Sequence, residues 1–266
     1  MSGMQVAERF AEVEGRKTRV LECGGEGSVV VLVHGLGLSA SCWRPHLPRL
    51  ARAGFRVLAP DLPGFGRSRA PRRGYAVPDT AAWLERFAAA EELAAAAWVG
   101  HSLSCQVLLR LGRDRPDRVT ALVLAAPTGQ DRGWSRVGGQ AIGLAVDALR
   151  ERPRVVAAVT RRYFAAPIAT VLTWFRARNQ RPETDASSVR APVLIVLGDE
   201  DPVVDARFAR KLARRIPDVR LRVLPHAAHA VAIDPADAFS DLTAEFLRRA
   251  SHRNRPPEPP PLWEAG

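Results

Sequence analysis

The sequence predicts an α/β fold in which helices flank a mostly parallel central sheet. Short apolar runs rich in β-branched residues, such as 29–33 and 192–197, are typical of strands buried on both faces of a parallel sheet. Helical segments separate these runs, so strands and helices alternate along much of the chain. The length of 266 residues fits one large α/β domain or two small ones, and 47% hydrophobic residues provide ample core.

An antiparallel hairpin is expected first, because residues 10–14 and 18–22 alternate in period two around Gly15. We then expect buried strands at 29–33, 55–59, 95–99, 119–125, 192–197 and 219–224. The accompanying helices are expected at 78–96, 103–113 and 206–215, with a last helix that ends near Arg249.

The alternation of strands and helices breaks between Pro127 and about Ser188, where Gly and Pro separate three or four helical pieces. We therefore expect a helical cap, residues 127–186, inserted into a core made of residues 1–126 and 187–250. The Pro-rich, polar tail at 251–266 is expected to be disordered.

Aromatic residues recur in the expected cap and also follow the first buried strand. One interpretation is that each aromatic side chain packs within its own segment. The other is that aromatic side chains facing the sheet edge bind an apolar substrate. The candidates are Trp43, Trp134, Phe164 and Trp174.

Composition excludes several classes of protein. The net charge of +11 comes from scattered Arg residues without a Lys/Arg block, so nucleic-acid binding is not expected. We expect no membrane partner, because no run of 18 apolar residues is present and the first 14 residues do not resemble a secretory signal. Three cysteines without metal-like spacing suggest a reducing, cytoplasmic location. The oligomeric state is not predicted.

The segment 98–105 is the strongest candidate for chemistry. A buried strand leads into it and a helix leads out, which predicts a sharp turn with Ser102 at its apex. Such a turn places the serine oxygen above the sheet edge, at a helix N-terminus that favours negative charge. The match to G-x-S-x-G is incomplete, because Ser104 stands where a second Gly is usual. A serine in an ordinary loop is the alternative.

The loop 34–40 allows two interpretations. Gly35, Gly37 and Ala40 fit the dinucleotide fingerprint G-x-G-x-x-A, with Asp61 about where a ribose-binding acid would lie. In the other interpretation the backbone N–H groups of Leu36 and Leu103 form an oxyanion hole. The second is favoured because prolines interrupt the long helix that a dinucleotide fold needs here. A structural turn is the preferred interpretation of Asp61.

An acid and a histidine follow Ser102 in the order that α/β-hydrolases use. The segments HGLGLSASCW, PDLPGFGRS, GHSLS, LGDEDPVV and HAAHAVAIDP together resemble that superfamily over nearly the whole folded length. The resemblance implies that Ser102 is the nucleophile, His229 the general base and Asp201 the acid that orients it, with Asp199 as the rival acid. His101 is expected to be a packing residue.

The resemblance implies a serine hydrolase that cleaves a small, largely apolar ester, thioester or lactone through an acyl-enzyme. No cofactor is expected, and no metal, because the pair His226 and His229 has no third ligand spaced nearby. Three alternatives stay open: hydrolysis of a C–C bond or an acyl rearrangement in the same pocket, a ligand-binding protein without catalysis, and a nicotinamide-dependent oxidoreductase. The only expected partner is a small-molecule substrate.

Overall fold

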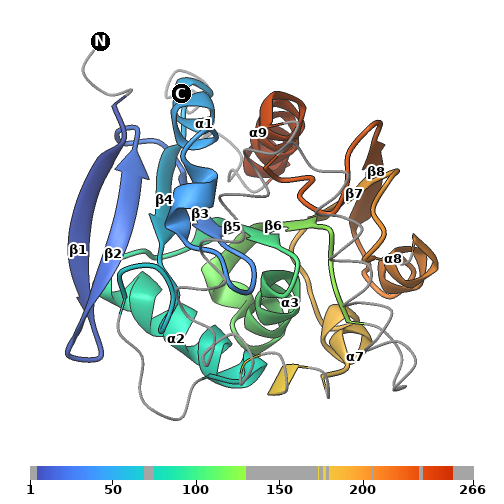
Figure 1. The fold of residues 1–266 in the computed structure, drawn as a ribbon, viewed down its shortest axis with the longest axis horizontal. Helices are drawn as coiled ribbons and strands as arrows, with labels where there is room; N and C mark the ends of the chain where they lie inside the picture. Colours follow the sequence, from blue (N-terminus) through green and yellow to red (C-terminus); the bar gives the residue numbers. More distant parts are fainter. Residues whose placement is uncertain are drawn as a thin grey trace, which may run out of the picture.

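The computed structural model describes residues 5–68, 75–129, 173, 176–177, 180–204, 206–233 and 236–253. Eight strands of this described chain form one sheet in the order β1-β2-β4-β3-β5-β6-β7-β8 (Figure 1). In chain order the strands are β1 (Ala7–Val13), β2 (Arg16–Cys23), β3 (Val29–Val33), β4 (Arg56–Pro60), β5 (Ala96–His101), β6 (Val119–Ala125), β7 (Val193–Gly198) and β8 (Val219–Leu224). β2 runs antiparallel to β1 and β4, and the remaining pairs are parallel, as the fold class predicted.

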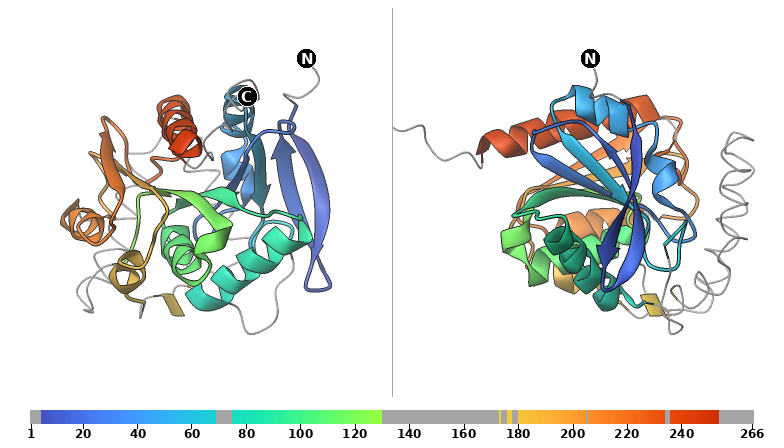
Figure 2. Two further views of the ribbon diagram at one scale, coloured as in Figure 1. Left: turned by 180° about the vertical axis from the view of Figure 1, so that it is seen from behind. Right: turned by 90° about the vertical axis from the view of Figure 1, so that its left-hand side faces the viewer.

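Helices cover both faces of the sheet (Figures 1 and 2). One face carries α1 and α9, which contact each other, and the other carries α2, α3 and α7. The helices of the described chain are η2 (Ala40–Trp43), α1 (Leu47–Arg52), α2 (Val77–Ala90), α3 (Ser104–Asp114), η3 (Pro116–Arg118), α7 (Pro182–Ala186), α8 (Ala206–Ala213) and α9 (Ala236–Arg253). This layering buries both faces of the central strands, which explains their continuous apolar sequences.

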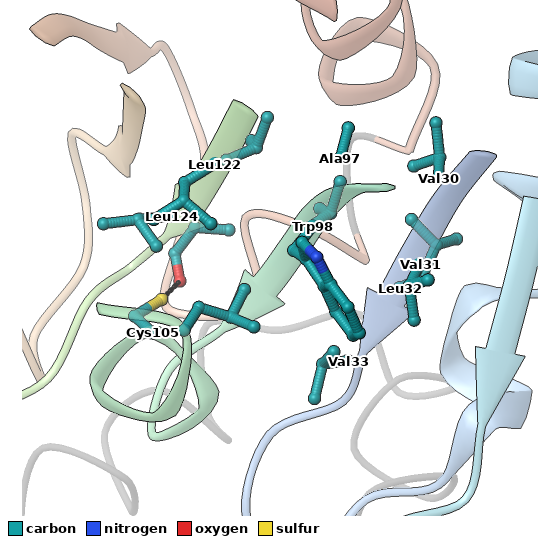
Figure 3. Packing of buried hydrophobic residues seen from close by; sticks show 14 of the residues in the cluster. Val30, Val31, Leu32, Val33, Ala97, Trp98, Cys105, Leu122 and Leu124 are labelled. Atoms are coloured by element: carbon teal, nitrogen blue, oxygen red, sulfur yellow. Dashed lines mark hydrogen bonds between the residues drawn. The ribbon is translucent and has the colours of Figure 1, made fainter. Parts of the chain in front are cut away.

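Buried apolar side chains of β3, β5 and β6 form part of the core where these strands lie side by side (Figure 3). Every residue of β5 is buried, and Trp98 at its centre is fully enclosed while its Nε1–H donates to the Arg118 carbonyl at 3.2 Å. That hydrogen bond satisfies the one polar atom of a side chain that is otherwise surrounded by apolar groups. The strand that leads into the turn at Ser102 is therefore enclosed in the core.

Two helices end four or more residues away from their predicted ends. α2 ends at Ala90 rather than near Ala96, because Glu92 adopts the left-handed conformation (φ 55°), which is incompatible with a continuing helix. α9 continues to Arg253, three residues into the tail expected from 251 onward. The buried Ala250 and the Ser251 hydroxyl, which donates to the Leu247 carbonyl at 3.0 Å, belong to this last helical turn.

The expected cap falls mostly outside the described residues. Its final segment, α7, packs against α3 and α8. In the described ranges no helix is long and apolar enough to span a bilayer.

Candidate active site

Ser102 lies at the apex of the turn between β5 and α3. Its φ of 56° lies in the left-handed region, which is rarely adopted by residues other than glycine, and its N–H donates to the Ala125 carbonyl of β6 at 2.8 Å. Gly100 allows α3 to approach closely, because a Cβ there would meet the Leu108 side chain at 2.8 Å. The turn therefore has the backbone strain expected of a nucleophile elbow.

His229 and Asp201 reach Ser102 from the loops that follow β8 and β7. Nε2 of His229 lies 3.1 Å from the Ser102 hydroxyl, and Nδ1 lies 3.0 Å from a carboxylate oxygen of Asp201. Parallel neighbouring strands bring these loops to one sheet edge. Gly198 permits their close approach, since a Cβ there would lie 2.0 Å from the Ala227 carbonyl oxygen. The structure thus brings all three residues together.

Asp201 is buried and well supplied with donors. Its side chain is 1% exposed, and its second oxygen accepts the N–H groups of Val203 and Val204 at 2.7 and 2.9 Å. Burial alone would raise the pKa of Asp201, but the His229 hydrogen bond and charge, with the two backbone N–H groups, hold that pKa below its ordinary value. An ionised carboxylate only accepts hydrogen bonds, so Nδ1 of His229 carries the proton and Nε2 can accept one from Ser102.

The rival acid, Asp199, lies elsewhere. It is exposed, and its carboxylate accepts the N–H of Ala227 at 3.3 Å. It contributes to the shape of the histidine loop, and its contact is with the loop backbone rather than with the imidazole.

Leu36 and Leu103 line one pocket. Leu103 follows Ser102 in the chain, and Leu36 follows Gly35, where an added Cβ would lie 3.4 Å from Cβ of Ser102. Leu103 immediately precedes α3, so its N–H is one of the donors that a helix N-terminus leaves without an internal partner. In the described part of the chain, neither backbone N–H is taken up by a hydrogen bond. Both are therefore available to an oxygen bound beside the serine.

The pocket itself is apolar. No charged side chain belongs to its described lining. Four lining residues carry hydroxyl groups, and those of Tyr75, Thr80 and Ser104 already donate to Glu14, to the Ala76 carbonyl and to the His34 carbonyl, with Thr173 as the fourth. Part of the wall consists of aliphatic and aromatic residues that the sequence analysis did not single out, because an apolar pattern indicates that a residue is buried without showing that it borders a pocket. These residues are Leu62, Phe65, Val77 and Val107.

His101 is fully buried beside the catalytic candidates. Its Nε2–H donates to the His229 carbonyl at 3.0 Å, and the two rings lie 5.2 Å apart. Burial, followed by the proximity of His229, lowers the pKa of His101 to about 4. It therefore stays neutral near pH 7 and packs against His229 without adding a competing charge.

Asp61 is a structural residue, in agreement with the preferred interpretation of that loop. Its buried carboxylate binds the Arg19 guanidinium at 2.7 and 2.9 Å and also accepts the N–H groups of Ala40 and Arg67, each at 2.7 Å. Gly66 makes room for it, because a Cβ there would lie 2.1 Å from a carboxylate oxygen. Asp61 thus fixes the far end of the loop that carries Leu36.

The structure corrects one substrate-binding candidate. Trp43 is fully buried, and its ring packs on His46 and Phe239, with centroids 5.2 and 6.3 Å apart. It faces α9 and so fills the core rather than the pocket, because η2 turns its side chain inward. The other candidates, Trp134, Phe164 and Trp174, lie outside the described residues. Within the described ranges, no cluster of three or more His, Cys, Asp or Glu side chains is arranged to hold a metal ion.

The eight-stranded sheet and the Ser–His–Asp arrangement at its edge define the class of protein. The model of the alpha/beta hydrolase family matches residues 30–242, so the chain belongs to this family. The family and three similar proteins with hydrolase names indicate that the protein is a hydrolase.

Several relatives match along most of their length. A protein of Variovorax paradoxus (strain S110) named as a carbamate hydrolase, RutD, is 32% identical over 85% of this chain and 94% of its own. The 2-hydroxy-6-oxo-6-(2'-aminophenyl)hexa-2,4-dienoic acid hydrolase of Metapseudomonas resinovorans is 29% identical over 93% of each chain. The crystal structure of CarC, described as a serine hydrolase involved in carbazole degradation, is 29% identical, with a TM-score of 0.77 over 92% of this chain and 99% of that one.

Proposed function

We propose that the protein is a serine hydrolase that cleaves its substrate through an acyl-enzyme on Ser102. The observation that carries the proposal is the continuous chain of hydrogen bonds from Asp201 through His229 to a serine held in a left-handed turn. A serine hydroxyl is a weak nucleophile, and an adjacent base oriented by an acid is the arrangement that activates it.

In the first half of the proposed reaction, Nε2 of His229 takes the Ser102 proton while Oγ bonds to the carbonyl carbon. The carbonyl electron pair moves to oxygen, where the N–H groups of Leu36 and Leu103 stabilise the negative charge. Loss of one such donor costs about 3–4 kcal/mol of transition-state stabilisation in enzymes of this kind. The imidazolium, stabilised by Asp201, then protonates the leaving group as its bond to carbon breaks.

In the second half, His229 takes a proton from water, and the resulting hydroxide oxygen bonds to the acyl carbon. Collapse of this second tetrahedral intermediate breaks the ester bond to Ser102, and the proton returns to its oxygen. The enzyme is restored without any other reactant.

The substrate class follows from the pocket. An apolar wall without a charged side chain in its described part favours a small, uncharged acyl group. We therefore propose a carboxylic ester, thioester or lactone with a short apolar acyl chain as the substrate.

Hydrolysis of a C–C bond next to a carbonyl is the second candidate. It is supported by the 29% identical relative whose name gives a 2-hydroxy-6-oxo-dienoic acid as its substrate. Such an acid carries a carboxylate, which the uncharged described lining does not favour. Turnover of β-diketones and of 4-nitrophenyl esters, measured side by side on the same preparation, separates the two.

Labelling by a fluorophosphonate probe, read by intact-protein mass spectrometry, tests the nucleophile. We expect one adduct per chain in the wild type, none in Ser102→Ala, and wild-type labelling in the control Ser187→Ala, whose exposed hydroxyl donates to the Thr184 carbonyl. Ester turnover should be lost in parallel. An adduct that persists in Ser102→Ala would show that another residue is the nucleophile.

A further inference from the structure

Ser104 occupies the position where the G-x-S-x-G pattern has its second glycine. The side chain is 2% exposed, and its hydroxyl donates to the backbone carbonyl of His34 across 70 residues of sequence. A glycine in the same place has no hydroxyl and makes no such bond. The departure from the pattern therefore adds a contact between two segments of the site.

The acceptor, His34, stands at the end of β3 and begins the loop that carries Leu36. Its own Nε2 accepts the N–H of Leu62 at 3.0 Å, and its ring lies edge-on to Phe65 at 5.7 Å. Leu62 and Phe65 line the apolar pocket. The hydroxyl of Ser104 is thus joined through one buried residue to the pocket wall.

The two segments that supply the oxyanion donors also press against each other. A Cβ on Gly35 would lie 2.9 Å from Nδ1 of His101 and 3.4 Å from Cβ of Ser102. Leu36 follows Gly35 directly, and Leu103 lies between Ser102 and Ser104. The spacing between the two donor N–H groups is therefore set by a steric contact on one side and by the Ser104 hydrogen bond on the other.

We propose that Ser104 is a positioning residue that fixes the separation of the Leu36 and Leu103 N–H groups through its bond to the His34 carbonyl. The assignment rests on the proposed serine-hydrolase function. Donors act on a developing oxyanion only when they are held about 3 Å from the position that it will occupy. The hydrogen bond between Ser104 and His34 restricts the relative motion of the two donor segments. With glycine at position 104, only van der Waals contacts would restrict that motion.

The test compares Ser104→Ala and Ser104→Gly with wild type for kcat and KM on 4-nitrophenyl butyrate. It also measures the inhibition constant of an alkyl trifluoromethyl ketone, which forms a hemiketal with the serine and places an oxyanion between the same two donors. Ser104→Thr keeps a hydroxyl and serves as the conservative replacement. Ser240→Ala is the matched control, because Ser240 is equally buried and its hydroxyl bonds to the Ala236 carbonyl and to Nδ1 of His46, not to either donor segment.

We expect kcat to fall about tenfold in both Ser104→Ala and Ser104→Gly, with KM within twofold of wild type. This loss is smaller than that caused by removing a whole oxyanion donor, because both donors stay present and only their spacing is loosened. The inhibition constant should rise by the same factor, Ser104→Thr should recover most of kcat, and Ser240→Ala should change only the melting temperature. If either Ser104 variant folds and keeps both wild-type kcat and inhibitor affinity, the assignment is wrong, although the proposed function stands. A wild type without ester turnover and without labelling would overturn the proposed function and this assignment together.

Discussion

Replacement of Asp201 by Asn tests the electrostatic core of the site while changing few atoms. The oxygen that accepts the Val203 and Val204 N–H groups has to remain an acceptor, so the new amide oxygen takes its place. The amide NH2 then lies where the other oxygen was, 3.0 Å from Nδ1 of His229. An NH2 group donates, so Nδ1 loses its proton to Nε2, which can no longer accept from Ser102.

This wrong tautomer should lower kcat by about ten-thousand-fold, which corresponds to about 5.5 kcal/mol of activation free energy. The assay is the steady-state hydrolysis of 4-nitrophenyl butyrate near pH 7, with the melting temperature recorded to show that Asp201→Asn is folded. Asp199→Asn is the matched control and should stay within twofold of wild type, because Asp199 is exposed and its carboxylate accepts a hydrogen bond from the backbone of the histidine loop, not from the imidazole. A folded Asp201→Asn that keeps more than a tenth of wild-type kcat would refute the reasoning. If kcat instead fell far more in Asp199→Asn than in Asp201→Asn, Asp199 would be the acid.

Two further predictions concern stability. Burial lowers the pKa of His46 to about 4 in the folded protein, below its unfolded value near 6.5. Between these values the unfolded chain binds a proton that the folded chain does not, so the free energy of unfolding falls as the pH is lowered from about 6.5 to about 4. Urea unfolding at pH 7 and 4.5 should show that wild type loses roughly 2–3 kcal/mol more than His46→Gln, and equal losses would contradict this. Arg19→Met and Asp61→Asn should each cost about 3–5 kcal/mol of unfolding free energy, because each leaves a buried group without its partner. The double variant should cost clearly less than the sum, whereas additivity would show that the pair does not interact.

Much of the fold could be predicted because the information is local. The apolar runs at 29–33 and 119–125 match β3 and β6, since a strand covered on both faces has no polar side to interrupt its sequence. The turn around Ser102 was predicted for the same reason, because a buried strand, a glycine and a helix follow one another within a few residues. The order of the three candidate catalytic residues was likewise read along the chain.

Contacts between distant residues could not be predicted in this way. The pattern of β2 gave no sign that Arg19 would pair with Asp61, 42 residues away. Trp43 looked as suitable for a pocket as for a core, and only the position of Phe239 on α9 decided between them. Sequence periodicity reports whether a position is buried, and it carries no information about which remote side chain buries it.

For this protein, the sequence by itself determined the alternation of strands and helices, the site of the sharp turn and the chemical types at the sheet edge. The resemblance to the family already favoured Asp201 over Asp199, two residues apart, and the tertiary structure supplied the physical reason: the bend that directs the Val203 and Val204 N–H groups onto one carboxylate also turns that carboxylate toward His229. Only the tertiary structure joined Ser104 to His34. Hydrogen bonds depend on ångström distances between segments that meet only after the sheet has formed, and no local pattern encodes those distances.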